Sequence, residues 1–99
     1  MKSKDILKYS NPKKVFANAR KYLGKKVIIR LSTRDEKKYM VYNPTEEKWV
    51  HFGQMGYEDF TKHKDQERRE DYLERSGNMR GEWRDNPYSA NNLARNLLW

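Results

Sequence analysis

The residues best suited to metal or acid–base chemistry lie between positions 51 and 65 of this 99-residue chain. The two histidines are His51 and His63, and Asp59 and Asp65 flank the second of them. No His-x-x-x-His pair exists to aim two imidazoles at one point, and no cysteine is present. We therefore expect no metal site: Asp65 is placed to cap a helix, and His63 to hydrogen-bond a backbone carbonyl.

Nucleophilic and phosphate-transfer chemistry also lack their motifs. The sequence has no Gly-x-Ser-x-Gly turn and no thiol, and Gly53-Gln54-Met55-Gly56 lacks the Lys-Ser/Thr that a phosphate-binding loop requires. A chain of 99 residues leaves little room for the cleft of a carboxylate-pair hydrolase. We expect no enzymatic activity, no cofactor and no small-molecule substrate.

The net charge of +8 is concentrated in the first part of the chain. Residues 1–40 hold 13 Lys/Arg against three acidic residues, whereas residues 41–99 hold nine against 11. Such asymmetry favours a polyanionic partner or an acidic protein surface, and the alternative is a basic face that only keeps the protein soluble. The candidate partner-binding residues are Lys2, Lys4, Lys8, Lys13, Lys14, Arg20, Lys21, Lys25 and Lys26.

Composition predicts one small domain with a thin core. Hydrophobic residues make up 35% of the chain and charged residues 36%, but aromatic residues, at 13%, bury much surface per residue. No apolar run approaches the roughly 20 residues that span a bilayer. The basic start of the chain has no apolar central region, so we do not expect it to be a signal peptide. The absence of cysteine suits a reducing compartment.

Periodicity predicts the elements of the first half. Residues 1–10 are polar without a period and are expected to form a basic arm, which leaves 11–99 as the domain. Asn11-Pro12 starts an amphipathic helix over 12–23 that ends at Gly24. Alternating segments at 26–31, 39–42 and 49–52 predict a three-stranded antiparallel meander, because the connections are short. The helix is expected to cover one face of this sheet.

The second half is expected to be helical. Asp65 caps a charged helix over 66–75, and Ser89 introduces a last helix over 90–98. The fold class is therefore α+β: an N-terminal amphipathic helix, a three-stranded antiparallel meander, and two short helices at the C-terminus. Because Leu97-Leu98-Trp99 is apolar, we expect it to be buried in the domain itself.

From residue 51 onward the chain resembles a family of small basic proteins of uncharacterised function from the nucleocytoplasmic large DNA viruses. The resemblance covers about half of the chain, and its order and spacing are most specific up to Arg75. It rests on His51-Phe52-Gly53, Gly56-Tyr57, Asp59-Phe60-Thr61, His63-Lys64-Asp65, Arg68-Arg69, Tyr72-Leu73, Arg75, Trp83 and Leu97-Leu98-Trp99. The resemblance implies that the protein is located in the virion and, during assembly, in the host cytoplasm. It implies no catalysed reaction. The resemblance also suggests an aromatic core made of Phe52, Tyr57, Phe60 and Tyr72. A polar network would hold this core in place, and its members would be His63, Asp59, Asp65 and Arg68.

Two functions follow as hypotheses. The first is a non-enzymatic structural protein of a large virus particle, a minor capsid or internal-shell component that binds other virion proteins. The second is a genome-associated protein that binds DNA without sequence preference through its basic N-terminal segment. The rings of Tyr39, Tyr42 or Trp49 could stack on bases if they are exposed. Aromatic side chains on a sheet are more often buried in the core.

Overall fold

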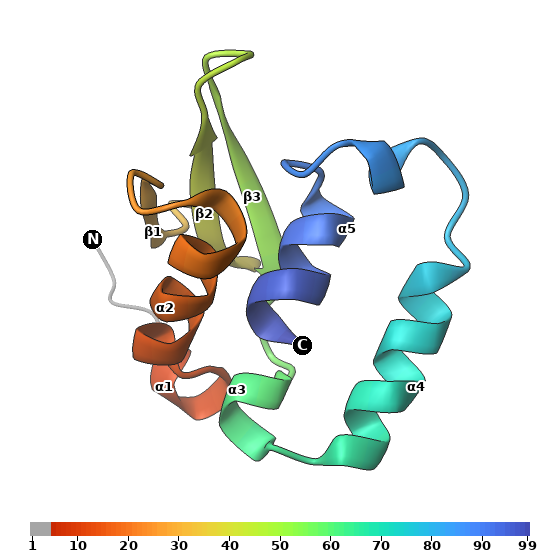
Figure 1. Ribbon diagram of the computed structural model, residues 1–99. Coiled ribbons are helices and arrows are strands. Elements are labelled where there is room, and N and C mark those ends of the chain that lie inside the picture. The colour runs from red at the N-terminus through yellow and green to blue at the C-terminus, as the bar shows by residue number, and fades with distance from the viewer. Residues whose placement is uncertain (1–4) are drawn as a thin grey trace.

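The computed structural model describes residues 5–99, so the candidate residues Lys2 and Lys4 lie outside the described part. The elements in chain order are α1 (Ile6–Tyr9), α2 (Pro12–Leu23), β1 (Ile29–Leu31), β2 (Lys37–Asn43), β3 (Lys48–Gln54), α3 (Phe60–His63), α4 (Gln66–Gly77), a 3₁₀ turn η1 (Trp83–Asp85), α5 (Ala90–Leu93) and a π-helical segment η2 (Ala94–Leu98). The α+β class is confirmed, with an N-terminal helix, an antiparallel sheet and C-terminal helices (Figure 1).

The predicted amphipathic helix forms with the predicted ends. The Asn11 side chain accepts a hydrogen bond from the Lys14 N–H at 3.3 Å, which caps α2, and Pro12 occupies the first turn. Gly24 ends the helix with φ +102°, a conformation that side chains rarely adopt. Val15 and Ala19 are completely buried, so α2 presents one apolar face to the core.

The meander is antiparallel with strand order β1-β2-β3. Tyr39 pairs with Phe52 and Val41 with Val50, so these alternate residues share the face that is turned to the core. The strands differ from their predicted bounds: the first is confined to Ile29–Leu31, while the second and third are longer than predicted. Strand β3 continues through Gly53, which has φ +81° and whose lack of a Cβ lets Leu98 approach closely: an added Cβ would lie 2.9 Å from the Leu98 side chain.

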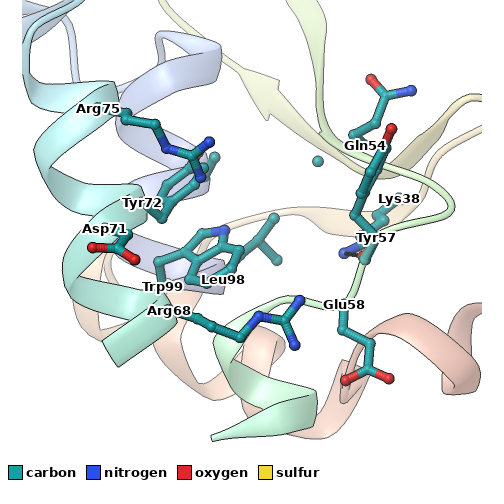
Figure 2. Close-up of a pocket in the computed structure, with 12 residues that line it drawn as sticks. Lys38, Gln54, Tyr57, Glu58, Arg68, Asp71, Tyr72, Arg75, Leu98 and Trp99 are labelled. Carbon is teal, nitrogen blue, oxygen red and sulfur yellow. Dashed lines mark hydrogen bonds between the residues drawn. The ribbon is translucent and has the colours of Figure 1, made fainter. Parts of the chain in front are cut away.

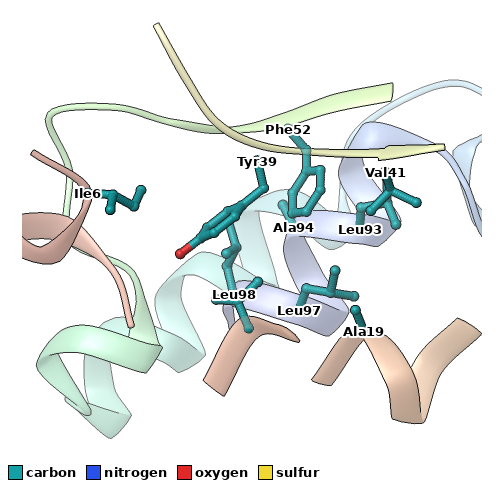
Figure 3. Close-up of a cluster of buried hydrophobic side chains, with 10 residues drawn as sticks. Ile6, Ala19, Tyr39, Val41, Phe52, Leu93, Ala94, Leu97 and Leu98 are labelled. Atoms are coloured by element: carbon teal, nitrogen blue, oxygen red, sulfur yellow. The ribbon is translucent and has the colours of Figure 1, made fainter. Parts of the chain in front are cut away.

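The C-terminal helix covers the sheet more directly than α2 does. Figure 1 shows α5 in front of the strands and α2 beside it, on the same side of the sheet. Leu93 and Leu97 are fully buried against the strand residues (Figure 3). Helix α2 reaches the sheet through Phe16, whose ring meets that of Tyr39 edge-on with the ring centroids 6.1 Å apart. The prediction that the chain's apolar end is buried in its own domain is confirmed for Leu97 and Leu98, whereas Trp99 is half-buried.

Residues 5–10 are packed against the domain, in contrast to the arm predicted for residues 1–10. Ile6 is buried in the core, and the Tyr9 carbonyl accepts a hydrogen bond from the Asp59 N–H at 3.0 Å. A helix of four residues is too short to show a periodic pattern, so the sequence did not predict that Ile6 is buried. The folded region begins before residue 11.

Two helices near the end of the chain also differ from their predicted form. The capping role of Asp65 is confirmed, since its side chain accepts the N–H groups of Glu67 and Arg68, and α4 extends to Gly77. Ser89 caps α5 as predicted. The helix expected over 90–98 widens into a π-helix at Ala94, where the Trp99 N–H bonds the Ala94 carbonyl at 3.2 Å. In the described part, no helix is long and apolar enough to cross a bilayer.

Candidate functional site

The outer face of α2 is a strongly basic surface. Lys13, Lys14, Arg20 and Lys21 are all exposed. Their spacing places them on one side of the helix, opposite the buried Val15. We call this surface the α2 basic face.

Neighbouring segments extend the α2 basic face at both ends. Lys8 is exposed before the helix and pairs with Asp5 at 3.6 Å, and Lys25 and Lys26 are exposed after it. Arg20 and Lys25 line the same shallow hollow, so the turn after α2 continues the surface toward β1. The structure thus places Lys25 next to the α2 basic face, and it shows Lys8 and Lys26 as exposed side chains on the flanking segments.

Two lysines of the second half join this surface, and sequence reasoning missed them. Lys64 lines a hollow together with Lys14, and Lys62 lines another beside Leu7 and Asn11. The link between the segments is Thr61, whose Oγ accepts the Asn11 N–H at 3.0 Å. No local pattern signals a contact between residues 50 positions apart.

Few acidic side chains offset this charge. From Ile6 to Arg34 the sequence contains no Asp or Glu. Within residues 5–99, Lys13, Lys14, Arg20 and Lys21 make no ion pair. Unpaired cations close together on one surface create a positive potential that attracts a polyanion.

A buried ion pair lies beneath the α1–α2 junction. Lys38 Nζ contacts Asp59 Oδ2 at 3.1 Å, and their side chains are only 3% and 1% exposed. Lys38 also donates to the Tyr57 carbonyl at 2.6 Å and to the Tyr9 carbonyl at 3.3 Å. Burial lowers the pKa of Lys38, and the carboxylate of Asp59 opposes this shift.

A chain of hydroxyl groups connects this ion pair to the core. Thr61 donates to Asp59 and lies 3.2 Å from the Ser10 hydroxyl, which accepts from the Tyr39 hydroxyl at 2.7 Å. Burial raises the pKa of Tyr39, so this phenol stays protonated as a donor. Lys38 and Asp59 are enclosed and their hydrogen-bonding groups are engaged. The network can therefore fix α3 beside α2, and it offers no accessible acid or base.

The aromatic signature suggested by the resemblance is only partly a core. Phe52 is buried, but Tyr57 is 69% exposed, which contradicts its predicted place there. Phe60 and Tyr72 are half-buried. Tyr72 stacks on Trp99 with ring centroids 4.3 Å apart.

The polar members of the signature do not form the single network that was suggested. Asp59 bonds Lys38 and Thr61, whereas Asp65 caps α4. His63 lies between the rings of Phe60 and Trp99, and its Nδ1 accepts the Asp65 N–H at 2.9 Å. The prediction that His63 bonds a backbone carbonyl is wrong. Arg68 is exposed on α4.

The remaining signature residues have structural contacts. His51 Nδ1 lies 2.6 Å from the Ser32 hydroxyl on the sheet. Trp83 donates its indole N–H to the Met79 carbonyl at 2.9 Å, and the guanidinium groups of Arg84 and Arg95 lie over its ring. No group of three or more potential metal ligands occurs among residues 5–99.

Sequence reasoning also missed two side chains that hold the C-terminal half together. Asn92 is buried and donates to the carbonyls of Trp83, Arg84 and Asn86, which ties η1 to α5. Arg95 donates to the Leu73 carbonyl at 2.6 Å and so anchors α4. An asparagine or an arginine within a helix gives no sequence signal for such long-range roles.

His63 is expected to make folding stability depend on pH. Desolvation, helped by the charge of Arg68, lowers its pKa, and its Nε2 is buried without a hydrogen-bond partner in the described part of the chain. The folded protein therefore favours neutral His63. The contribution of neutral His63 to folding stability is complete above the pKa of His63 in the unfolded state, about 6.5. It is lost as the pH falls through the lower pKa of His63 in the folded state.

Urea unfolding of wild-type protein and His63→Gln should be compared from about pH 7.5 to about pH 5. We expect the wild-type free energy of unfolding to fall more steeply than that of the variant as pH decreases. Parallel profiles for wild type and His63→Gln would contradict this prediction.

Together the fold and these surfaces define a small, basic α+β protein with a positively charged helix face and an enclosed polar network. Residues 27–76 match a family of unknown function, DUF5754, and the protein belongs to that family. The match runs from just before β1 into α4, so it includes Lys38 and Asp59 but not α2. No curated protein and no solved structure gave a significant match.

Proposed function

We propose that the protein is a non-enzymatic binding protein whose α2 basic face holds double-stranded DNA through its phosphate backbone. The observation that carries this proposal is the set of four exposed, unpaired cations on one helix face, within a stretch free of acidic residues. Such a face neutralises phosphates and releases counterions, which gives affinity without sequence preference.

The test is binding to random-sequence duplex DNA over a series of salt concentrations. Replacing Lys13, Lys14, Arg20 and Lys21 by Gln should weaken binding at least about tenfold and reduce the salt slope by about 3.6, because each of the four lost phosphate contacts contributes about 0.9. Fluorescence anisotropy with labelled duplex measures both quantities.

A matched pair of variants separates position from net charge. Lys13→Gln/Lys21→Gln removes two charges from the α2 basic face, and Lys48→Gln/Arg80→Gln removes two exposed charges from other elements. The first should weaken binding clearly more than the second. Equal losses would show that only net charge matters, and unchanged affinity in the fourfold variant would refute the proposal.

A structural role in a large DNA virus particle is the second proposal, and the outer face of the sheet supports it. Strand alternation places Arg30, Met40, Tyr42 and Trp49 on the face away from α5. Ile28, next to this face, is 46% exposed, and β1 and β3 are the edge strands. Met40 is buried and the rings of Tyr42 and Trp49 are half-buried, so the support comes from the exposed Ile28 beside the edge strand β1. An exposed apolar side chain at an open strand edge favours contact with another protein.

This second role predicts that the protein remains in purified particles after salt washing that strips DNA-bound material. A photo-crosslinking amino acid at position 28 should then capture another virion protein. Absence of the protein from purified particles would exclude the structural role and leave the DNA proposal standing.

A further inference from the structure

A cavity of about 430 Å³ lies between α4, the loop after β3 and the last residues of the chain (Figure 2). Its volume is within the range of sites that hold small ligands, about 300–1,000 Å³. The cavity lies apart from the α2 basic face: α4 forms one wall and the segment around Tyr57 forms the other.

Two arginines of α4 supply unpaired positive charge to this cavity. Arg68 and Arg75 are seven positions apart, so two helical turns bring them to the same face of α4. Figure 2 shows both guanidinium groups directed toward the cavity, whereas the carboxylates of Asp71 and Glu58 are directed away from it. Within residues 5–99 neither arginine side chain makes an ion pair or a hydrogen bond.

The third cation at the cavity is not available to a ligand. Lys38 is bound by Asp59 and by the Tyr9 and Tyr57 carbonyls. Other residues hold the α4 wall in place: Arg69 donates to the Trp99 carbonyl at 2.5 Å, and Arg95 bonds the Leu73 carbonyl. Arg68 and Arg75 are therefore not needed to attach α4, and their charge is free for an anion.

Aromatic rings line two sides of the same cavity. Tyr72 and Trp99 are stacked nearly parallel, with an interplanar angle of 12°, next to the arginines. Tyr57 is on the opposite wall with Gln54 (Figure 2). A flat ring that enters between these walls meets aromatic surface on both sides, and the Gln54 amide offers a donor and an acceptor to its edge.

We propose that this cavity binds a mononucleotide, with its phosphate held by Arg68 and Arg75 and its base between Tyr57 and the Tyr72–Trp99 pair. Guanidinium groups pair with phosphate oxygens in a two-pronged geometry, and two of them match the charge of a phosphate monoester. The size of the cavity and its aromatic walls select a phosphate that carries a planar group over phosphate alone.

Titration with adenosine monophosphate, followed by NMR of the tryptophan indole N–H signals, tests this site in the full-length protein. The Trp99 signal should shift as nucleotide is added, and the titration curve should give a dissociation constant between about 10 μM and about 1 mM. The Trp49 and Trp83 signals should stay in place. Adenosine and inorganic phosphate, titrated separately, should each bind at least about tenfold more weakly than the nucleotide.

Variants distinguish this site from the DNA-binding surface. Arg68→Gln/Arg75→Gln should weaken nucleotide binding at least about tenfold and leave the α2-dependent binding of duplex DNA in place. Lys48→Gln/Arg80→Gln, the matched control, and the fourfold α2 variant should bind the nucleotide like the wild type. An unmoved Trp99 signal, unchanged binding by the arginine variant, or equal binding of adenosine and the nucleotide would each overturn the proposal.

Discussion

Replacing Lys38 by Met is expected to lower the free energy of unfolding by about 3–5 kcal/mol. The ammonium group is almost completely enclosed and bonds Asp59 and two backbone carbonyls. Its removal leaves a buried carboxylate without a compensating charge, and that cost exceeds the favourable transfer of the added apolar group. Urea denaturation monitored by tryptophan fluorescence measures the change.

An exposed ion pair provides the matched control. Lys48 and Glu46 are 3.0 Å apart, almost the same distance as Lys38 and Asp59, but both side chains are exposed. Lys48→Met should therefore cost less than about 1 kcal/mol. The double variant Lys38→Met/Asp59→Leu should recover much of the loss, because no buried charge remains. Equal costs for Lys38→Met and Lys48→Met would contradict the enclosed position of Lys38.

Replacing Leu97 by Ala is the second change with a large expected effect, a loss of about 3–5 kcal/mol in the free energy of unfolding. Leu97 is completely buried in the cluster where the C-terminal helix meets the sheet and Ala19 of α2 (Figure 3). Truncation removes apolar contacts from all three elements and leaves a cavity that a close-packed core fills only in part.

Leu7→Ala is the control for the same chemical change at an exposed site. Leu7 is 69% exposed, so its truncation should change the free energy of unfolding by no more than about 0.5 kcal/mol. Thermal and urea unfolding of both variants provide the comparison. A cost below about 1 kcal/mol for Leu97→Ala would mean that the C-terminal helix does not form part of the core.

Both predictions bear on the proposed binding surfaces. The Lys38–Asp59 pair and Thr61 hold α3, with Lys62 and Lys64, beside the start of α2. The Asn18 side chain donates to the Leu97 carbonyl at 2.9 Å, which attaches α2 to the end of the chain. The residues that stabilise the fold therefore also hold Lys62 and Lys64 beside the α2 basic face.

The sequence predicted the elements whose signals are local. Asn11, Asp65 and Ser89 marked helix starts because a capping side chain bonds N–H groups only two or three positions away. The meander followed from alternating residues and short connections, since neither requires knowledge of distant parts of the chain. The α2 basic face followed in the same way from charge and helical period.

The sequence did not predict the features that depend on distant contacts. Tyr57 and Phe52 are both aromatic and belong to the same signature, yet one is exposed and the other buried. Lys38 was one lysine among the 13 Lys/Arg of residues 1–40, and only its approach to Asp59 sets it apart. The cavity beside Arg68 and Arg75 depends on where α4 lies relative to the sheet, which no local pattern encodes.

Local signals along the chain were enough to predict the α+β class, the main helices and strands, and the positively charged face of residues 12–23. Capping, alternation and charge act over a few residues, and these signals are therefore visible along the chain. Packing between distant parts of the chain determined that residues 5–10 join the fold, that Lys38 and Asp59 are enclosed together, and that Lys62 and Lys64 lie beside α2. Burial is a property of the packed chain, because the same lysine or tyrosine is solvated or enclosed according to the residues that the fold brings against it.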